Sequence, residues 1–171
     1  MKPSDSFDEV ILREGAALSR LAASYERDPA LREDLFQEIC LAIWRALRTF
    51  RGDASVRTYV FRIAHNRAVS HVVKRAATKA QSLDALENEP VLVGRSVEEN
   101  LDLTVRAERL KDAISDLPLG LRQPVIMALE GFRAREIGEV LGISENAVSI
   151  RMTRARQILK EILTVTEEGK R

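Results

Sequence analysis

The sequence contains few of the residues that form disulfide, metal or redox sites. It has one cysteine and two histidines in 171 residues, so an internal disulfide is excluded and no zinc-ligand spacing is present. His65 and His71 lie six residues apart, which favours side chains at the surface or beside a bound partner over a shared metal. We interpret Cys40 as a small buried hydrophobic residue, and we expect no metal and no other cofactor.

Helix breakers and long apolar runs are also scarce. Only five prolines and eight glycines interrupt a chain that is 45% hydrophobic and 31% charged, and no segment alternates in polarity as a half-buried strand does. No run approaches the about 18 apolar residues of a membrane span, and the N-terminal segment MKPSDSFDEV lacks the layout of a secretory signal. We therefore expect an all-α, cytoplasmic protein without membrane insertion.

Patterns that would support catalysis are missing as well. The sequence has no Gly-rich phosphate loop and no nucleophile arrangement. The acidic residues between Glu98 and Asp116 are scattered around a helix instead of being paired in a pocket. These features predict a protein that is not an enzyme and has no small-molecule substrate.

The charges are unevenly distributed although the net charge is only +1. Between Arg45 and Arg75 eight basic residues face one aspartate, which gives this segment a net charge of +7. Between Asp84 and Asp116 nine acids face four basic residues, a net charge of −5. The basic segment favours a polyanionic partner.

Capping signals divide the first half of the chain into three helices. Ser6 and Glu9 have the spacing of a capping box, so a helix should start there and end just before Asp28. Asp28 is suited to cap a second helix, and the proline after it is suited to the first helical position. This second helix should reach about Arg51. Ser55 is suited to cap a third helix after a Gly-Asp turn.

The second helix carries two neighbouring apolar stripes, so we expect it to be buried on most sides, with Trp44 in the core or at a partner interface. The stripes consist of Leu31, Leu35, Ile39, Ile43, Ala46 and Phe50, and of Phe36, Cys40, Trp44 and Leu47. The polar strip that remains consists of Asp34, Gln37, Glu38, Arg45 and Arg48, with Leu41 in its middle.

The helical pattern is lost between residues 77 and 95, where Asn88, Pro90 and Gly94 mark turns. A second capping box at residues 96–99 then opens a helix, and a further helix should begin near Gln123–Pro124. We therefore expect two small helical domains, residues 1–76 and 96–171, joined by a flexible linker of residues 77–95.

The segment from Glu136 to Leu159 has the features of a helix-turn-helix. Gly138 allows two helices to touch, Gly142 tolerates a positive φ in the turn, and Ser144 can cap the second helix. The side of that helix opposite its apolar residues presents Asn146, Ser149, Ile150, Thr153 and Gln157, with Arg154 and Arg156 on the flanks. Such side chains can reach base edges and phosphates in a major groove. This favours DNA binding over an ordinary helical hairpin, with Arg151, nearer the core side, as the least certain contact.

Two segments together resemble bacterial sigma factors. The stretch EDLFQEICLAIWRALRTFRGDASVRTYVFRIAHNRAV is similar to their second region. The stretch LPLGLRQPVIMALEGFRAREIGEVLGISENAVSIRMTRARQIL is similar to their fourth region. The third region is missing between them, which is the layout of the extracytoplasmic-function (ECF) group. The resemblance implies two helical domains that bind core RNA polymerase and recognise promoters.

The resemblance also assigns residues to three surfaces. The polymerase surface, which meets the clamp helices of the largest polymerase subunit, consists of Asp34, Gln37, Glu38, Leu41 and Arg45. The −10 surface, which melts the downstream promoter element, consists of Gly52, Asp53, Ser55, Arg62, Asn66, Arg67, His71, Lys74 and Arg75. The −35 surface, which reads the upstream element as duplex, consists of Asn146, Ser149, Ile150, Thr153, Arg154, Arg156 and Gln157.

Some positions depart from the family pattern. Tyr59 stands where the family usually has tryptophan, and we interpret it as a core change. Arg133 and Ala134 precede the first helix of the helix-turn-helix where a capping serine is usual, so that helix should fray or be capped in another way.

The resemblance further implies an anti-sigma partner and a protein that is monomeric when free. Two other readings stay open. In one, the chain is a conventional helix-turn-helix regulator, which would need a dimer to read a two-fold operator. In the other, it is an interaction module that has lost DNA binding.

Overall fold

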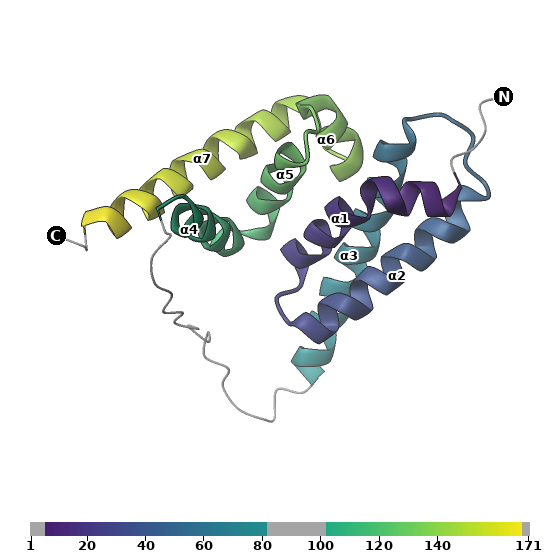
Figure 1. Cartoon of the computed structure of the whole chain (residues 1–171), viewed down its shortest axis with the longest axis horizontal. Helices are drawn as coiled ribbons and strands as arrows, with labels where there is room; N and C mark the ends of the chain where they lie inside the picture. The colour runs from purple at the N-terminus through teal and green to yellow at the C-terminus, as the bar shows by residue number, and fades with distance from the viewer. Residues whose placement is uncertain (1–5, 82–101, 169–171) are drawn as a thin grey trace.

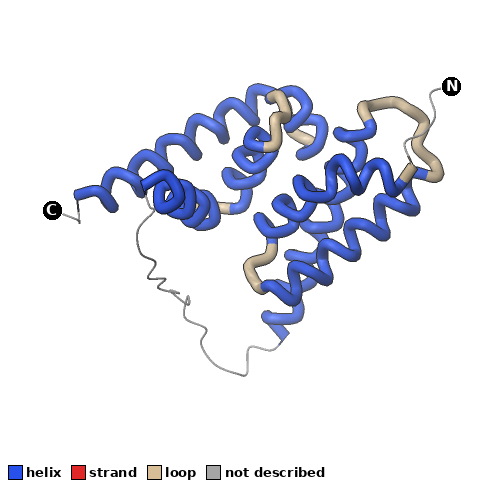
Figure 2. The backbone as a smooth tube through the Cα atoms, viewed as in Figure 1, coloured by secondary structure: helices blue, strands red, loops and turns tan. Residues whose placement is uncertain are grey.

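The structure is a computed structural model that describes residues 6–81 and 102–168. Within these ranges every regular element is an α-helix (Figure 1, Figure 2). The N-terminal lobe contains α1 (Phe7–Tyr25), α2 (Pro29–Leu47) and α3 (Val56–Gln81), and the C-terminal lobe contains α4 (Asp102–Asp116), α5 (Leu119–Leu129), α6 (Ala134–Leu141) and α7 (Glu145–Glu168). The all-α prediction is confirmed.

The predicted caps are present at the start of all three N-terminal helices. The Ser6 hydroxyl accepts from the Glu9 N–H, and the Glu9 carboxylate accepts from the Ser6 N–H at 2.8 Å. The Asp28 carboxylate accepts two N–H groups of the first turn of α2, and the Ser55 hydroxyl accepts the Thr58 N–H at 3.0 Å. Each cap satisfies donors that have no partner inside the helix.

Three helix limits differ from the prediction. The second helix ends at Leu47, four residues before the predicted Arg51, so that Phe50 lies in the loop after it. The third helix continues to Gln81, five residues into the predicted linker of residues 77–95, because its last residues are mostly alanine, lysine and glutamine, which favour helix without an apolar stripe. The rest of that linker and the capping box at 96–99 lie outside the described residues. In the C-terminal lobe α5 begins at Leu119, ahead of the predicted start, and Pro124 lies inside it.

The prediction that α2 is buried on most sides is wrong. Only Leu35, Ile39 and Ile43 are fully buried, because α1 and α3 cover a single side of the helix. The second apolar stripe faces outward only in part: Trp44 is 47% exposed and Cys40 is half-buried instead of being a core residue, whereas Phe36 and Leu47 pack against the core. Burial raises the pKa of the Cys40 thiol.

The helix-turn-helix has the predicted turn and locking residues. Gly142 ends α6 with a φ of 68°, and the Ser144 hydroxyl accepts the Ala147 N–H at 3.2 Å. A Cβ atom added to Gly138 would lie 2.7 Å from the Ile143 carbonyl oxygen, closer than nonbonded atoms approach. The first helix is capped in another way, since the Glu136 carboxylate accepts the Arg133 N–H at 2.7 Å.

Glu26 links the three N-terminal helices. Its carboxylate accepts the Asp28 N–H at 3.0 Å and contacts His71 at 3.1 Å, and it is also bonded to Arg75. Burial alone would raise the pKa of Glu26, but the hydrogen bonds from Arg75, Asp28 and His71 outweigh it and hold the pKa below its ordinary value. A charged Glu26 therefore stabilises the end of α1 against α2 and α3.

The cores of the two lobes are continuous. Buried residues of α1, α2 and α3 pack in one cluster with residues of the C-terminal lobe, namely Met127, Phe132, Ile137, Val140 and Val148. A smaller cluster of Ile114, Leu117, Val125 and Ala155 lies within the C-terminal lobe. Figure 1 shows the lobes side by side, with α5 against α1 and α6 against α3.

We expect Gly138→Ala to lower the free energy of unfolding by about 1–3 kcal/mol, because the new methyl group forces α6 away from the turn. Urea unfolding followed by circular dichroism measures this change. Gly120→Ala is the matched control, since no atom lies within 4 Å of a Cβ at that helical position. Equal stability of the two variants would contradict the close contact at Gly138.

We expect Glu26→Gln to lower the free energy of unfolding by about 1–3 kcal/mol at neutral pH. Since the pKa of Glu26 is lower in the folded than in the unfolded chain, its contribution is present above the ordinary value of 4.5 and is lost as the pH falls through the folded pKa. The difference between wild type and variant should therefore shrink in acid. Glu108→Gln changes an exposed carboxylate and should show no such difference; a pH-independent gap for Glu26→Gln would contradict this account.

Candidate nucleic-acid interface

The outward side of α7 carries the whole predicted −35 surface. Its seven residues are all exposed: Asn146, Ser149, Ile150, Thr153, Arg154, Arg156 and Gln157. The opposite side is buried, with Val148 and Ala155 fully inaccessible. Arg151 is half-buried, and its guanidinium points toward the Gly120 carbonyl at 3.5 Å. The helix thus presents short polar side chains between two arginines, a surface that fits the width of a major groove.

A small hollow lies beside the loop of the predicted −10 surface. It has a volume of about 160 Å³ and is lined by Thr49, Phe50, Arg51, Asp53, Ala54, Tyr59 and Arg62. The rings of Phe50 and Tyr59 lie 4.7 Å apart between centroids, and the Arg62 guanidinium lies 6.0 Å from the Tyr59 ring. Aromatic faces beside cations suit unpaired bases and their phosphates.

Phe50, Arg51 and Tyr59 were not among the predicted site residues. We expected Tyr59 to be a simple core residue, whereas it is half-buried and its ring lines the hollow. Its hydroxyl donates to the Ala46 carbonyl at 3.3 Å, which fixes the ring. The signal in the sequence was the pair of aromatic residues on either side of the Gly-Asp turn.

The predicted −10 residues fall into two groups. Arg62, Asn66, Arg67 and Lys74 are exposed, as are Gly52, Asp53 and Ser55 in the preceding loop. His71, which is half-buried, and Arg75, which is exposed, pair with Glu26 at the end of α1. The structure therefore brings seven of the nine predicted −10 residues to the surface without an ion pair in the described part of the chain.

His65 does not lie at the surface, contrary to the prediction. It is 9% exposed, and its Nδ1 lies 2.5 Å from the Tyr25 hydroxyl. Burial lowers the pKa of His65 and raises that of Tyr25. The side of α3 that carries His65 faces α1, so this residue holds two helices together and cannot reach DNA.

The predicted polymerase surface is one exposed face of α2. Asp34, Gln37, Glu38, Leu41 and Arg45 are all exposed, and Leu41 is 47% accessible. Beside it runs an open apolar groove of about 360 Å³, lined by Phe7, Glu33, Phe36, Gln37, Cys40, Leu41 and Trp44. The groove is formed by the outer apolar stripe of α2, and charged side chains border it, as at protein–protein interfaces.

Among the described residues, no three histidines, cysteines or carboxylates come together as a metal site. No helix in the described ranges is long and apolar enough to span a membrane.

Both lobes match known sequences. Residues 10–78 match the family model of sigma-70 region 2, and residues 107–159 match that of sigma-70 region 4. The ECF RNA polymerase sigma-E factor of Escherichia coli K12 is 31% identical over 134 residues, which cover 74% of this chain and 70% of that protein. The RNA polymerase sigma factor CnrH of Cupriavidus metallidurans is 28% identical over 170 residues, covering 95% of this chain and 89% of CnrH.

A solved structure extends the likeness to three dimensions. The sigma factor RpoE of Bartonella quintana, in complex with the anti-sigma factor NepR, superimposes with a TM-score of 0.74 and 26% identity, covering 93% of this chain and 97% of RpoE. With region 2 in the N-terminal lobe and region 4 in the C-terminal lobe, the chain belongs to the ECF sigma factors of the sigma-70 family.

Proposed function

We propose that the protein initiates transcription through three separate surfaces. The polymerase surface on α2 binds core RNA polymerase, the −10 surface opens the downstream promoter element, and the −35 surface on α7 binds the upstream element as duplex. The observation that carries this proposal is the outward side of α7, on which all seven predicted contacts are exposed opposite a buried stripe. We further propose that the protein is a monomer, that it works in the cytoplasm and that it has no catalytic activity of its own.

The −10 assignment is modified by the geometry. Arg62, Asn66, Arg67 and Lys74 are free to meet DNA, and we add Phe50, Arg51 and Tyr59 because they line the hollow beside the loop. His71 and Arg75 hold Glu26 in the free protein. Their role is therefore to stabilise α3 against α1, so that the exposed cations keep a fixed spacing.

The exposed apolar groove beside the polymerase surface also supports an anti-sigma partner. Trp44 and Leu41 are each 47% exposed, and such a patch on a free protein marks a partner site. The similar RpoE was solved with the anti-sigma factor NepR. A partner that covers this groove would compete directly with polymerase for α2.

If polymerase and −35 duplex bind at separate surfaces, two substitutions should each weaken one of these interactions and leave the other unchanged. Glu38→Arg reverses a charge on the polymerase surface and should abolish binding to core polymerase while leaving binding to −35 duplex unchanged. Arg154→Ala should leave polymerase binding unchanged and weaken duplex binding by about 1–3 kcal/mol if Arg154 contacts a base. Pull-down with core enzyme and electrophoretic mobility shift measure the two affinities.

Two exposed residues of α4 provide matched controls for these substitutions. Asp112→Arg has the same charge reversal as Glu38→Arg, and Lys111→Ala loses a positive charge as Arg154→Ala does; both should behave like wild type. If each test substitution reduced both affinities together, the separation of surfaces would be wrong. A dimer that footprints a palindrome would favour the regulator reading.

A further inference from the structure

The middle of the −35 surface is less polar than its sequence indicates. The Ser149 hydroxyl donates to the Glu145 carbonyl oxygen at 3.1 Å, and the Thr153 hydroxyl donates to the Ser149 carbonyl oxygen at 3.0 Å. Both hydroxyl hydrogens are used inside α7, so they are not available to the acceptor groups of a base. What Thr153 can still offer to another molecule is its methyl group and a hydrogen-bond acceptor.

Ile150 is the apolar residue of this surface. It is 45% exposed and lies three residues before Thr153, so the two side chains are neighbours on one face of the helix. Both residues are branched at Cβ, which restricts their rotamers in a helix before any ligand binds. A single exposed isoleucine is common at protein surfaces, but this one lies in the centre of the −35 surface beside a second methyl group. We call Ile150 and Thr153 the apolar pair.

Polar side chains that can read bases lie on either side of the apolar pair. Asn146 lies one turn before Ile150 and Arg154 one turn after it, and both are exposed. The helical rise puts about 6 Å along the axis between Ile150 and each of them, just under two base pairs at roughly 3.4 Å each. Asparagine and arginine form paired hydrogen bonds with adenine and with guanine in a major groove. The apolar pair therefore meets the bases between those two contacts.

Resting on the proposed function, we infer that the apolar pair makes the protein specific for a thymine in the middle of the −35 element. Thymine is the base that presents a methyl group in the major groove. In the complex this methyl group lies against Ile150 and the Thr153 methyl and leaves water, which favours binding. An amino group of adenine or cytosine at the same position loses its hydrogen bonds to water and gains none from Ile150.

The probe for this inference is a pool of DNA duplexes with a randomised central segment, from which the full chain selects its preferred sequence. Wild type should enrich a sequence in which one central thymine is required. Replacing that thymine by uracil removes the methyl group and keeps every hydrogen-bonding group of the base. We expect the replacement to weaken wild-type binding about fourfold, the effect of leaving one methyl group in water. Electrophoretic mobility shift measures the two affinities.

Substitutions in the apolar pair separate the methyl contact from hydrogen bonding. Ile150→Ala should lose most of the preference for thymine over uracil. Thr153→Ser, which lacks the methyl group and keeps the hydroxyl, should weaken the preference, whereas Thr153→Val, which keeps the methyl group and lacks the hydroxyl, should retain it. Leu110→Ala is the matched control, because Leu110 on α4 is 39% exposed and the substitution removes a side chain of the same size. This control should keep the fourfold preference.

Equal binding of the thymine and uracil duplexes by wild type would overturn the inference, and so would a full thymine preference in Ile150→Ala. In both cases wild type still selects a sequence, so the proposed −35 surface stands. If wild type enriches no sequence at all from the pool, duplex binding itself fails and the proposed function fails with it.

Discussion

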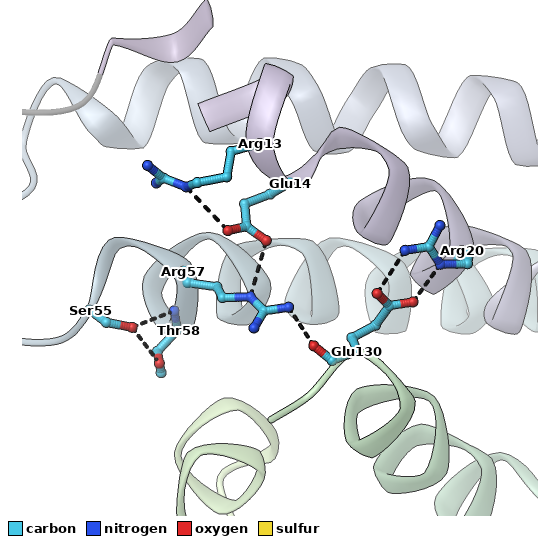
Figure 3. Close-up of polar contacts among 7 residues, drawn as sticks. All are labelled: Arg13, Glu14, Arg20, Ser55, Arg57, Thr58 and Glu130. Carbon is cyan, nitrogen blue, oxygen red and sulfur yellow. Dashed lines mark hydrogen bonds and ion pairs between the residues drawn. The ribbon is translucent and has the colours of Figure 1, made fainter. Parts of the chain in front are cut away.

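The burial of Phe132 against Phe61 and Arg57 is the interaction on which the arrangement of the molecule depends. Phe132 of the C-terminal lobe lies in the same buried cluster as residues of α1, α2 and α3, and its ring packs on that of Phe61. Arg57 lies over the ring and also reaches Glu14 and the Glu130 carbonyl, so its charge is neutralised where the lobes meet (Figure 3). The same cluster contains Ile137 and Val140 of α6, which packs on α3.

The proposed functional surfaces are formed by helix faces that stay exposed after the helices have packed together. The side of α7 opposite Val148 and Ala155 is exposed among the described residues, and it carries the polar residues and arginines that suit a major groove. In the described part of the chain α2 packs mainly on α1 and α3, and its outer face is left with the groove beside Leu41 and Trp44. The functional surfaces of this protein are therefore the faces of α2 and α7 that are not buried in the core.

Local features were predictable from the sequence, and contacts distant along the chain were not. Ser6, Asp28 and Ser144 were identified as caps because a cap acts within three residues, and Gly138 and Gly142 were identified because a turn needs small or left-handed residues. The Glu26 cluster could not be predicted, since His71 lies 45 residues away in sequence. Similarly, the ion pair of Arg20 with Glu130 joins residues that are separated by 110 residues, and no local pattern connects them.

The most direct test of the central claim is run-off transcription with core RNA polymerase, followed by mapping of the start sites. If the two lobes recognise separate promoter elements as parts of one initiation factor, the purified protein should direct initiation from one defined start on a matching template. Widening the spacing between the elements should abolish that start. The absence of a specific start on any genomic template, together with a dimeric footprint on a palindrome, would contradict the account.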